Sequence, residues 1–296
     1  MTGAAESSSR VSSLRLLIAN PVTAVSAALL ALIASVAVTA DWIAPHGIND
    51  VDVPNALRPP SGTHWFGTDE LGRDVLSRVL VATQASMRVA VVSVAFAVVV
   101  GVTVGVVSGY RGGWLDTVFM RVVDVMFAFP VLLLALAVVA ILGPGVTTTI
   151  LAIGIVYTPI FARVARASTM SVRVEPFVSV SRSMGTGHLY ILSRHILPNI
   201  AGPLVVQTSL SLAFAILSEA ALSFLGLGIQ PPQPSLGRMI FDSQGFVTMA
   251  WWMAVFPGAA IFVTVLAFNL LGDGLRDVLD PRQRTLVEAR RKGMPQ

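Results

Sequence analysis

Long apolar runs, separated by short polar segments, follow one another along most of the chain. A helix needs about 20 mainly apolar residues to cross the hydrocarbon core of a bilayer. Runs of roughly this length or longer, almost free of charge, lie at residues 16–40, 89–108, 115–142, 146–162, 200–228 and 247–271. The pattern predicts an all-α integral membrane protein with six transmembrane helices.

The polar segments divide the chain into three predicted regions. Residues 1–86 hold a polar tail, the first helix and an extracytoplasmic segment, residues 87–272 a five-helix core, and residues 273–296 a charged cytoplasmic tail. Residues 16–40 end in Val-Thr-Ala, which resembles a signal-peptide cleavage site. The apolar stretch is longer than the roughly 7–15 residues of a signal peptide, so we expect an uncleaved helix.

An interfacial helix is predicted within the extracytoplasmic segment. Leu71, Val75 and Val79 recur on one helical face, as an amphipathic helix outside the membrane requires. Asp74 and Arg78 have the i, i+4 spacing of an ion pair on such a helix.

Composition places the chain in the membrane class. It is 54% hydrophobic and only 12% charged, whereas soluble domains have about 25% charged residues, and its mean hydropathy is +0.77. The net charge of +4 comes without basic clusters interleaved with aromatic residues, which argues against a nucleic-acid partner. Membrane lipid is the expected surrounding.

Several kinds of site are excluded by residues that the sequence lacks. It has no cysteine, and its four histidines, at 46, 64, 188 and 195, show no metal-ligand pairing within a helical turn, so no metal site is expected. The single lysine, Lys292, does not follow a glycine run as a P-loop requires. We expect no cofactor on this chain and, without an HExxH or GxSxG motif, no enzyme activity. ATP, if it drives the protein, must bind another chain.

The basic residues indicate the orientation. With both termini cytoplasmic, six spans place most of the 20 Lys and Arg residues on the cytoplasmic side, as the positive-inside rule requires. Five spans would move either the C-terminal tail or the 171–199 segment outside and weaken this asymmetry. The basic residues then expected outside are Arg58, Arg73, Arg78, Arg88 and Arg238.

The 171–199 segment is a long polar interlude between apolar runs. Glu175-Pro176 predicts a helix start, and Gly185-Thr186-Gly187 predicts its end, because glycine adopts the left-handed conformation without steric cost. Two short amphipathic helices at an elbow follow from this pattern, and such a segment presents a surface to a partner. Their predicted apolar faces are Phe177, Val180 and Met184 on the first helix and Leu189, Leu192 and Ile196 on the second, with Arg173, Arg182, His188, Arg194 and His195 on the polar sides.

Gly185, nine intervening residues, and then His-Ile-Leu-Pro-Asn at 195–199 resemble the cytoplasmic loop of permease subunits in ATP-binding-cassette importers. That family carries Glu-Ala-Ala six residues before the glycine and docks the loop into a cleft of the ATPase, whereas this chain has Ser-Val-Ser. The resemblance implies a coupling role for the loop; a plain cytoplasmic connector is the alternative. The residues it singles out are Ser179, Ser181, Arg182, Gly185, His188, Arg194, His195 and Pro198.

Three further stretches resemble the C-type subunit of dipeptide and oligopeptide permeases: GTDELGRD at 67–74, Arg121-x-x-Asp124 before Phe129-Pro130, and AALSFLGLG at 220–228. The resemblance implies an importer-type (MetI-like) permease fold in a bacterial cytoplasmic membrane. Its implied partners are a homologous B-type permease, two ATPase subunits that bind ATP and Mg, and an extracytoplasmic substrate-binding protein.

Arg121, Asp124 and Glu219 are candidates for a pathway or gating role, because charges within membrane helices are costly. Arg121 and Asp124 can instead form a local structural pair. Glu219 should face a protein interface, a watery pathway or an arginine of a partner. Two other functions stay open: import of another cargo, such as nickel, an opine or haem, and an ion-coupled secondary carrier that uses Asp124 and Glu219.

Overall fold

The computed structural model describes residues 21–279, and every regular element among them is helical. The predicted polar tail at residues 1–15, the first residues of the first helix and most of the predicted C-terminal tail lie outside this range. The longer elements are α2 (Pro21–Ile43), α3 (Val75–Arg111), α4 (Gly113–Phe127), α5 (Val131–Leu142), α6 (Val146–Val172), α7 (Pro176–Ser183), α9 (Leu197–Phe224), α10 (Leu236–Asp242) and α11 (Trp252–Leu279). The short ones are η1 (Val53–Asn55), α8 (His188–Tyr190), the π-helix η2 (Ile191–Ile196) and η3 (Ser243–Gly245).

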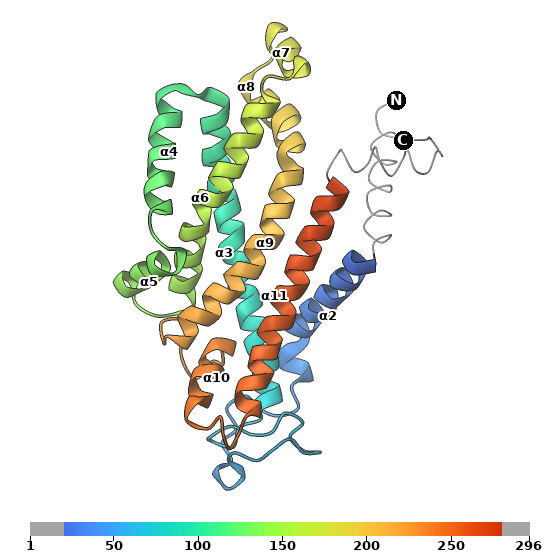
Figure 1. The fold of residues 1–296 in the computed structure, drawn as a ribbon, viewed down its shortest axis with the longest axis vertical. Helices are drawn as coiled ribbons and strands as arrows, with labels where there is room; N and C mark the ends of the chain where they lie inside the picture. The colour runs from blue at the N-terminus through green and yellow to red at the C-terminus, as the bar shows by residue number, and fades with distance from the viewer. Residues whose placement is uncertain (1–20, 280–296) are drawn as a thin grey trace.

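Five of these helical stretches are long and apolar enough to cross a membrane, and the α4–α5 pair makes up to six. The all-helical membrane fold predicted from the sequence is therefore confirmed. The predicted straight span over residues 115–142 is wrong, because α4 and α5 meet at 94°. Pro130 begins α5 after the break, and a proline cannot continue the hydrogen-bond ladder of a preceding helix. Figure 1 shows α5 turned away from the long axis of the bundle.

Helices α3 and α6 form the central pair of the bundle. Glycines on α3 allow their backbones to approach: a Cβ built on Gly101 would lie 2.6 Å from the Thr158 carbonyl oxygen, and one on Gly105 would collide with the Ala162 carbonyl oxygen. Small residues at such positions let membrane helices pack closely. Gly101 and Gly105, four residues apart on α3, are thus part of the α3–α6 contact surface.

The remaining long helices pack around this pair. Helix α9 contacts α3, α6 and α11, and α11 also contacts α2. The elbow formed by α7 and α8 lies at one end of the bundle, and α10 with the loop between α2 and α3 lies at the other (Figure 1). The fold therefore places the elbow and the α2–α3 loop at opposite ends of its long axis.

The interfacial helix predicted near residue 75 does not exist as a separate element. Helix α3 runs without interruption from Val75 to Arg111, and Asp74 caps its N-terminus by accepting a hydrogen bond from the Ser77 N–H. The predicted Asp74–Arg78 ion pair is also wrong: Arg78 lies 3.5 Å from Asp69 and donates to the Ile48 carbonyl at 2.8 Å. An aspartate directly before a helix is favoured as a cap, and that role competes with the ion pair.

Candidate functional site

The elbow between α7 and α8 is built around Gly185. Helix α7 begins at Pro176 and ends at Ser183, and Gly185 follows with φ of +76°. Its N–H donates to the Arg182 carbonyl at 3.0 Å, and the next N–H, of Thr186, donates to the Ser181 carbonyl at 3.2 Å. The predicted helix, its glycine end and its left-handed corner are all present.

A small apolar cluster anchors the elbow to the bundle. Val178, Ile191 and Ile196 are fully buried, and they pack with Val106 of α3 and Ala165 of α6. Contrary to the prediction from the sequence pattern, the second elbow helix is not a separate short helix. It continues through the π-helix η2 into α9, whose first turn holds Pro198, a position that tolerates proline because its missing N–H has no helical partner.

The predicted apolar face of α7 points away from the bundle. Val178 is the buried residue of this helix, whereas Val180 and Met184 are 59% and 80% exposed, and Leu189 beyond the corner is 83% exposed. Exposed apolar groups of this kind mark contact surfaces. We call Phe177, Val180, Met184 and Leu189 the elbow surface. Phe177 also contacts the His195 ring, with 5.9 Å between ring centroids, and all four side chains are exposed in the described part of the chain.

Polar residues of the elbow mostly connect its two short helices, contact α3 or face solvent. His195 accepts or donates across the corner to Ser181, with 3.1 Å between Nε2 and Oγ. His188 Nδ1 lies 2.9 Å from the Tyr110 hydroxyl on α3, and the Arg182 guanidinium lies 5.5 Å from the Tyr110 ring centroid. The other members of the predicted set, Ser179, Arg194 and Pro198, are exposed.

Two arginines, one within α6 and one directly after it, bind residues at the end of α3 and the start of α4. Arg166 makes a bidentate contact with Asp116, at 2.5 Å and 2.7 Å, and Ser108 donates to the same carboxylate. Arg173 donates to the Gly109 carbonyl at 2.7 Å. Asp116 had not been singled out from the sequence, because its partners lie 8 and 50 residues away and only the packing of α3, α4 and α6 joins them.

The pathway candidates Arg121 and Asp124 lie near the end of α4. They do not form the predicted local pair: Asp124 accepts a hydrogen bond from Arg163 of α6 at 2.9 Å, with both side chains more than half exposed. The Arg163 guanidinium also lies 3.9 Å from the Phe127 ring centroid. Arg121 is exposed and has no ion-pair partner among residues 21–279. An exposed pair of this kind contributes little stability.

Glu219 is fully buried between α9 and α3. Its two carboxylate oxygens accept hydrogen bonds from the Ser86 hydroxyl at 2.5 Å and the Ser223 hydroxyl at 2.7 Å. Within the described chain these two hydroxyls satisfy the carboxylate. It needs no partner interface, watery pathway or partner arginine, which were the three surroundings predicted for it. Ser223 also accepts from the Ile229 N–H at 3.1 Å, so Glu219 fixes the turn that follows α9.

An apolar hollow of about 520 Å³ opens between α5, α6 and α9. Val131, Leu132, Phe214 and Leu217 line it, and Tyr157 brings a hydroxyl that lies 3.2 Å from another lining residue, Ser218. No sequence pattern predicts this hollow, because it exists only where α5 bends away from α4. Its apolar lining suits a contact with another membrane helix or a passage shared with one.

At the opposite end, the GTDELGRD stretch folds into a compact charged turn. Asp69 accepts from the Leu71 and Arg73 N–H groups, both at 2.9 Å, and from Arg73 Nε at 2.6 Å. Burial, and after it the neighbouring Asp69 carboxylate, raises the pKa of Glu70. The Trp252 indole of α11 donates to the Thr68 carbonyl at 3.0 Å. This motif therefore joins the segment between α2 and α3 to both α3 and α11.

Comparisons with known proteins agree with this architecture. Residues 101–285 match the family described as binding-protein-dependent transport system inner membrane component, and residues 11–60 match the N-terminal TM domain of oligopeptide transport permease C. The dipeptide transport system permease protein DppC of Alkalihalophilus pseudofirmus is 42% identical over 84% of this chain and 82% of its own length. The glutathione transport system permease protein GsiD of Shigella sonnei is 47% identical over 85% and 83%.

The fold also resembles a solved structure. A chain of the MetNI methionine ABC transporter in an inward-facing conformation superposes with a TM-score of 0.57 at 18% identity, covering 69% of this chain and 96% of its own. At that identity the likeness concerns the fold alone. It agrees with the predicted importer-type permease architecture.

Proposed function

Because the chain belongs to the family of binding-protein-dependent transport system inner membrane components, we propose that it is the C-type permease subunit of an ATP-driven dipeptide or oligopeptide importer. Relatives that carry dipeptide and glutathione transport in their names support a peptide cargo. The observation that carries the proposal is the elbow surface, which is apolar, exposed and fixed to the bundle by a buried cluster. Such a surface suits a contact with an ATPase subunit.

The proposed mechanism is rigid-body gating. Two ATPase subunits, which bind ATP and Mg, would close on nucleotide binding and displace the elbow. Helices α6 and α9 would follow, because the elbow is continuous with both of them, and alternate the access of a central cavity. This chain contributes half of that cavity, and it holds no nucleotide or cofactor of its own.

A homologous B-type permease is the proposed second half. The apolar hollow between α5, α6 and α9 is the surface that we assign to this contact or to the shared route. Both termini and the elbow would lie on the cytoplasmic side, where Arg111, Arg163, Arg166, Arg173, Arg182 and Arg194 gather by the positive-inside rule. The loop between α2 and α3 would then face the extracytoplasmic substrate-binding protein.

Reconstitution of the purified complex tests the proposal. Proteoliposomes that contain the permease pair, its ATPases and its binding protein should take up labelled dipeptide only with Mg-ATP. Uptake driven by an ion gradient without ATP would support a secondary carrier and contradict the proposal. Mg-ATP-dependent uptake of nickel, an opine or haem, without uptake of dipeptide, would overturn the peptide cargo while leaving the importer intact.

A second experiment tests the role of the elbow surface. Met184→Ser and Leu189→Ser remove apolar area that is already exposed in this chain, so the fold should be retained. We expect the double variant to lose its ATPase subunits during purification. Val51→Ser, at a residue 57% exposed in the external loop, is the matched control and should keep them. Equal ATPase retention in both variants would contradict docking at the elbow.

A further inference from the structure

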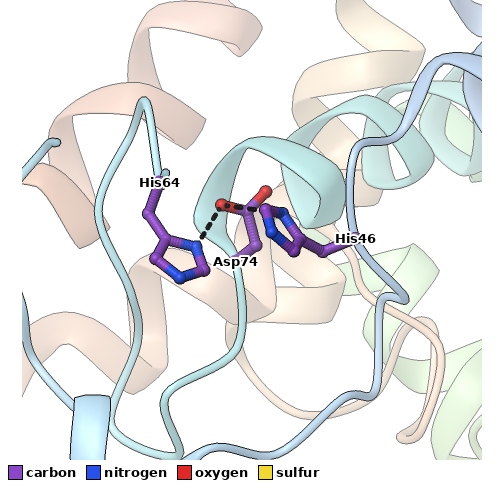
Figure 2. A group of neighbouring side chains, drawn as sticks. All are labelled: His46, His64 and Asp74. Carbon is purple, nitrogen blue, oxygen red and sulfur yellow. Dashed lines mark hydrogen bonds and ion pairs between the residues drawn. The ribbon is translucent and has the colours of Figure 1, made fainter. Parts of the chain in front are cut away.

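Two histidines and one aspartate converge at the start of α3, on the face opposite to the elbow. Figure 2 shows His46 and His64 approaching the Asp74 carboxylate from two different loop segments. The Nδ1 atoms of His64 and His46 lie 2.9 Å and 3.8 Å from the same oxygen, Asp74 Oδ1. All three potential ligand atoms lie within 4.8 Å of one another, and the two rings are 4.7 Å apart at their centroids.

The spacing fits a tetrahedral metal ion. Zinc lies about 2.0–2.2 Å from nitrogen and carboxylate ligands, which separates tetrahedral ligand atoms by about 3.3 Å. The two observed separations, 2.9 Å and 3.8 Å, bracket this value. Shifts of about half an ångström would bring both Nδ1 atoms to this distance from Asp74 Oδ1. The three candidate ligand atoms lie within 4.8 Å of one another, and a fourth position remains for water.

Hydrogen bonds already hold each ligand in place. Asp74 Oδ2 accepts from the Ser77 N–H at 2.8 Å and from the Ser77 hydroxyl at 2.7 Å, which leaves Oδ1 facing the histidines. The same hydroxyl accepts from the His46 N–H at 3.1 Å. The His64 carbonyl accepts from the N–H groups of Ser61 and Gly67. The two Ser77 contacts orient the Asp74 carboxylate as outer hydrogen bonds orient a metal ligand, and the backbone contacts fix the segments that carry the two histidines.

The cluster combines a buried anchor with an accessible side. The Asp74 side chain is 1% exposed, whereas those of His64 and His46 are 20% and 39% exposed. His46 and Asp41 both line an open hollow of about 350 Å³, so an ion can reach His46 past a carboxylate. A nearly buried carboxylate and two imidazoles nearer to solvent suit a cation that enters through this hollow.

From this geometry we infer that His46, His64 and Asp74 form a structural site for a divalent transition-metal ion of the zinc class. Two imidazole nitrogens and one carboxylate oxygen favour such an ion over Mg²⁺, which prefers oxygen ligands. The bound ion joins the segment after α2, the external loop and the start of α3. The inference concerns the external end and does not depend on the cargo or on ATP coupling.

This site escaped the sequence analysis for a simple reason. The expectation of no metal site rests on the absence of histidines paired within a helical turn. His46, His64 and Asp74 instead come from three separate segments. His64 lies 10 residues before Asp74, and the loop between them must fold back before the side chains can meet.

The test is metal binding by the purified complex. The complex is purified with an affinity tag that contains no histidine, and a chelator then removes any bound metal. Equilibrium dialysis against Zn²⁺ should load one ion per chain, and excess Mg²⁺ should not displace it. His46→Ala should weaken zinc binding by about 100-fold or more, since even loss of an outer-shell contact costs about 10–100-fold. His188→Ala, which removes a histidine at the elbow, is the control and should bind zinc as the wild type does.

A second variant separates ligand loss from misfolding. His46→Cys supplies a thiolate in place of the imidazole, and the chain has no other cysteine. We expect this variant to bind Co²⁺ with a sulfur-to-metal charge-transfer band that the wild type lacks. Zinc binding equal in the wild type and His46→Ala, or equal loss in His188→Ala, would overturn the inference. Absence of the charge-transfer band in a stably folded His46→Cys protein would do the same.

Discussion

Gly185 allows the elbow model to be tested with a series of substitutions. Its φ is +76°, and a Cβ added there would meet no atom within 4 Å among the described residues. Substitution therefore creates backbone strain without a steric clash. Left-handed backbone costs an ordinary residue roughly 1–2 kcal/mol, asparagine tolerates it best, and a β-branched residue tolerates it worst.

The expected effect follows from this cost. A strain of about 1–2 kcal/mol multiplies the ratio of distorted to native elbows by roughly 5–30. The number of dipeptides imported per ATP hydrolysed should fall in the order Gly185→Asn, Gly185→Ala, Gly185→Val. For the valine variant we expect a loss of up to about 30-fold, while the ATPases continue to hydrolyse ATP.

Uptake and ATP hydrolysis measured in the same proteoliposomes give the coupling ratio directly. Gly143 offers a matched control, because its φ is +87° and an added Cβ would also meet nothing within 4 Å. It lies between α5 and α6, away from the elbow, and its ψ of 159° places it in a conformation that is essentially restricted to glycine. Gly143→Val therefore carries at least as much backbone strain at another site. Full coupling in Gly185→Val, or equal uncoupling in Gly143→Val, would refute the reasoning.

Three further predictions concern other parts of the chain. Glu219→Gln replaces an oxygen that accepts a serine hydroxyl with an amide that cannot, and should destabilise the protein by about 1–3 kcal/mol; thermal denaturation and uptake assays check it, and wild-type values in both would assign Glu219 no role. Gly105→Leu should cost at least about 1–3 kcal/mol by overpacking α3 against α6, seen as a lower melting temperature than in Gly62→Leu, where an added Cβ meets nothing. Thiols introduced at Ser183 and Ser61 should react with an impermeant maleimide only from the cytoplasmic and the external side respectively; the reverse labelling would contradict the proposed orientation.

Periodicity and local turn chemistry were sufficient to predict the spans and the elbow. Apolar runs of bilayer length predicted the membrane helices, because a single segment satisfies its own backbone groups in a bilayer only as a helix. Gly185 marked the corner, because a left-handed residue after a helix is a local requirement that a single residue type meets best. Both signals are contained within a few turns of the chain, so no tertiary contact was needed to interpret them.

Predictions that depended on the choice between two partners were wrong. Asp124 pairs with Arg163 of α6 and not with Arg121 on its own helix, and Asp74 caps α3 and faces His64 in place of pairing with Arg78. In each case the i, i+3 or i, i+4 spacing allowed a local pair, but a long-range contact was available. Sequence spacing cannot rank these options, because the fold alone decides which distant residue comes near.

The apolar face of α7 was assigned by the same reasoning, and its failure is informative. The spacing of Phe177, Val180 and Met184 predicted the face that packs, yet Val178 is the residue that packs against the bundle. A helix with apolar residues on both sides has two surfaces to bury, and a single chain covers only one. The second surface is the one that the proposed ATPase partner would cover.

The buried side of the elbow explains how a displacement there can reach the membrane. Val178 packs with Ile191 and Ile196 in the same cluster as Val106 of α3 and Ala165 of α6. Close-packed interiors transmit displacement because they compress little, so a push on α7 should move α3 and α6 together. Helix α5, bent by 94° from α4, leaves a hollow beside α6 and α9 in place of tight packing. Motion that starts at the elbow is therefore expected to change the shape of that hollow more than the α3–α6 contact.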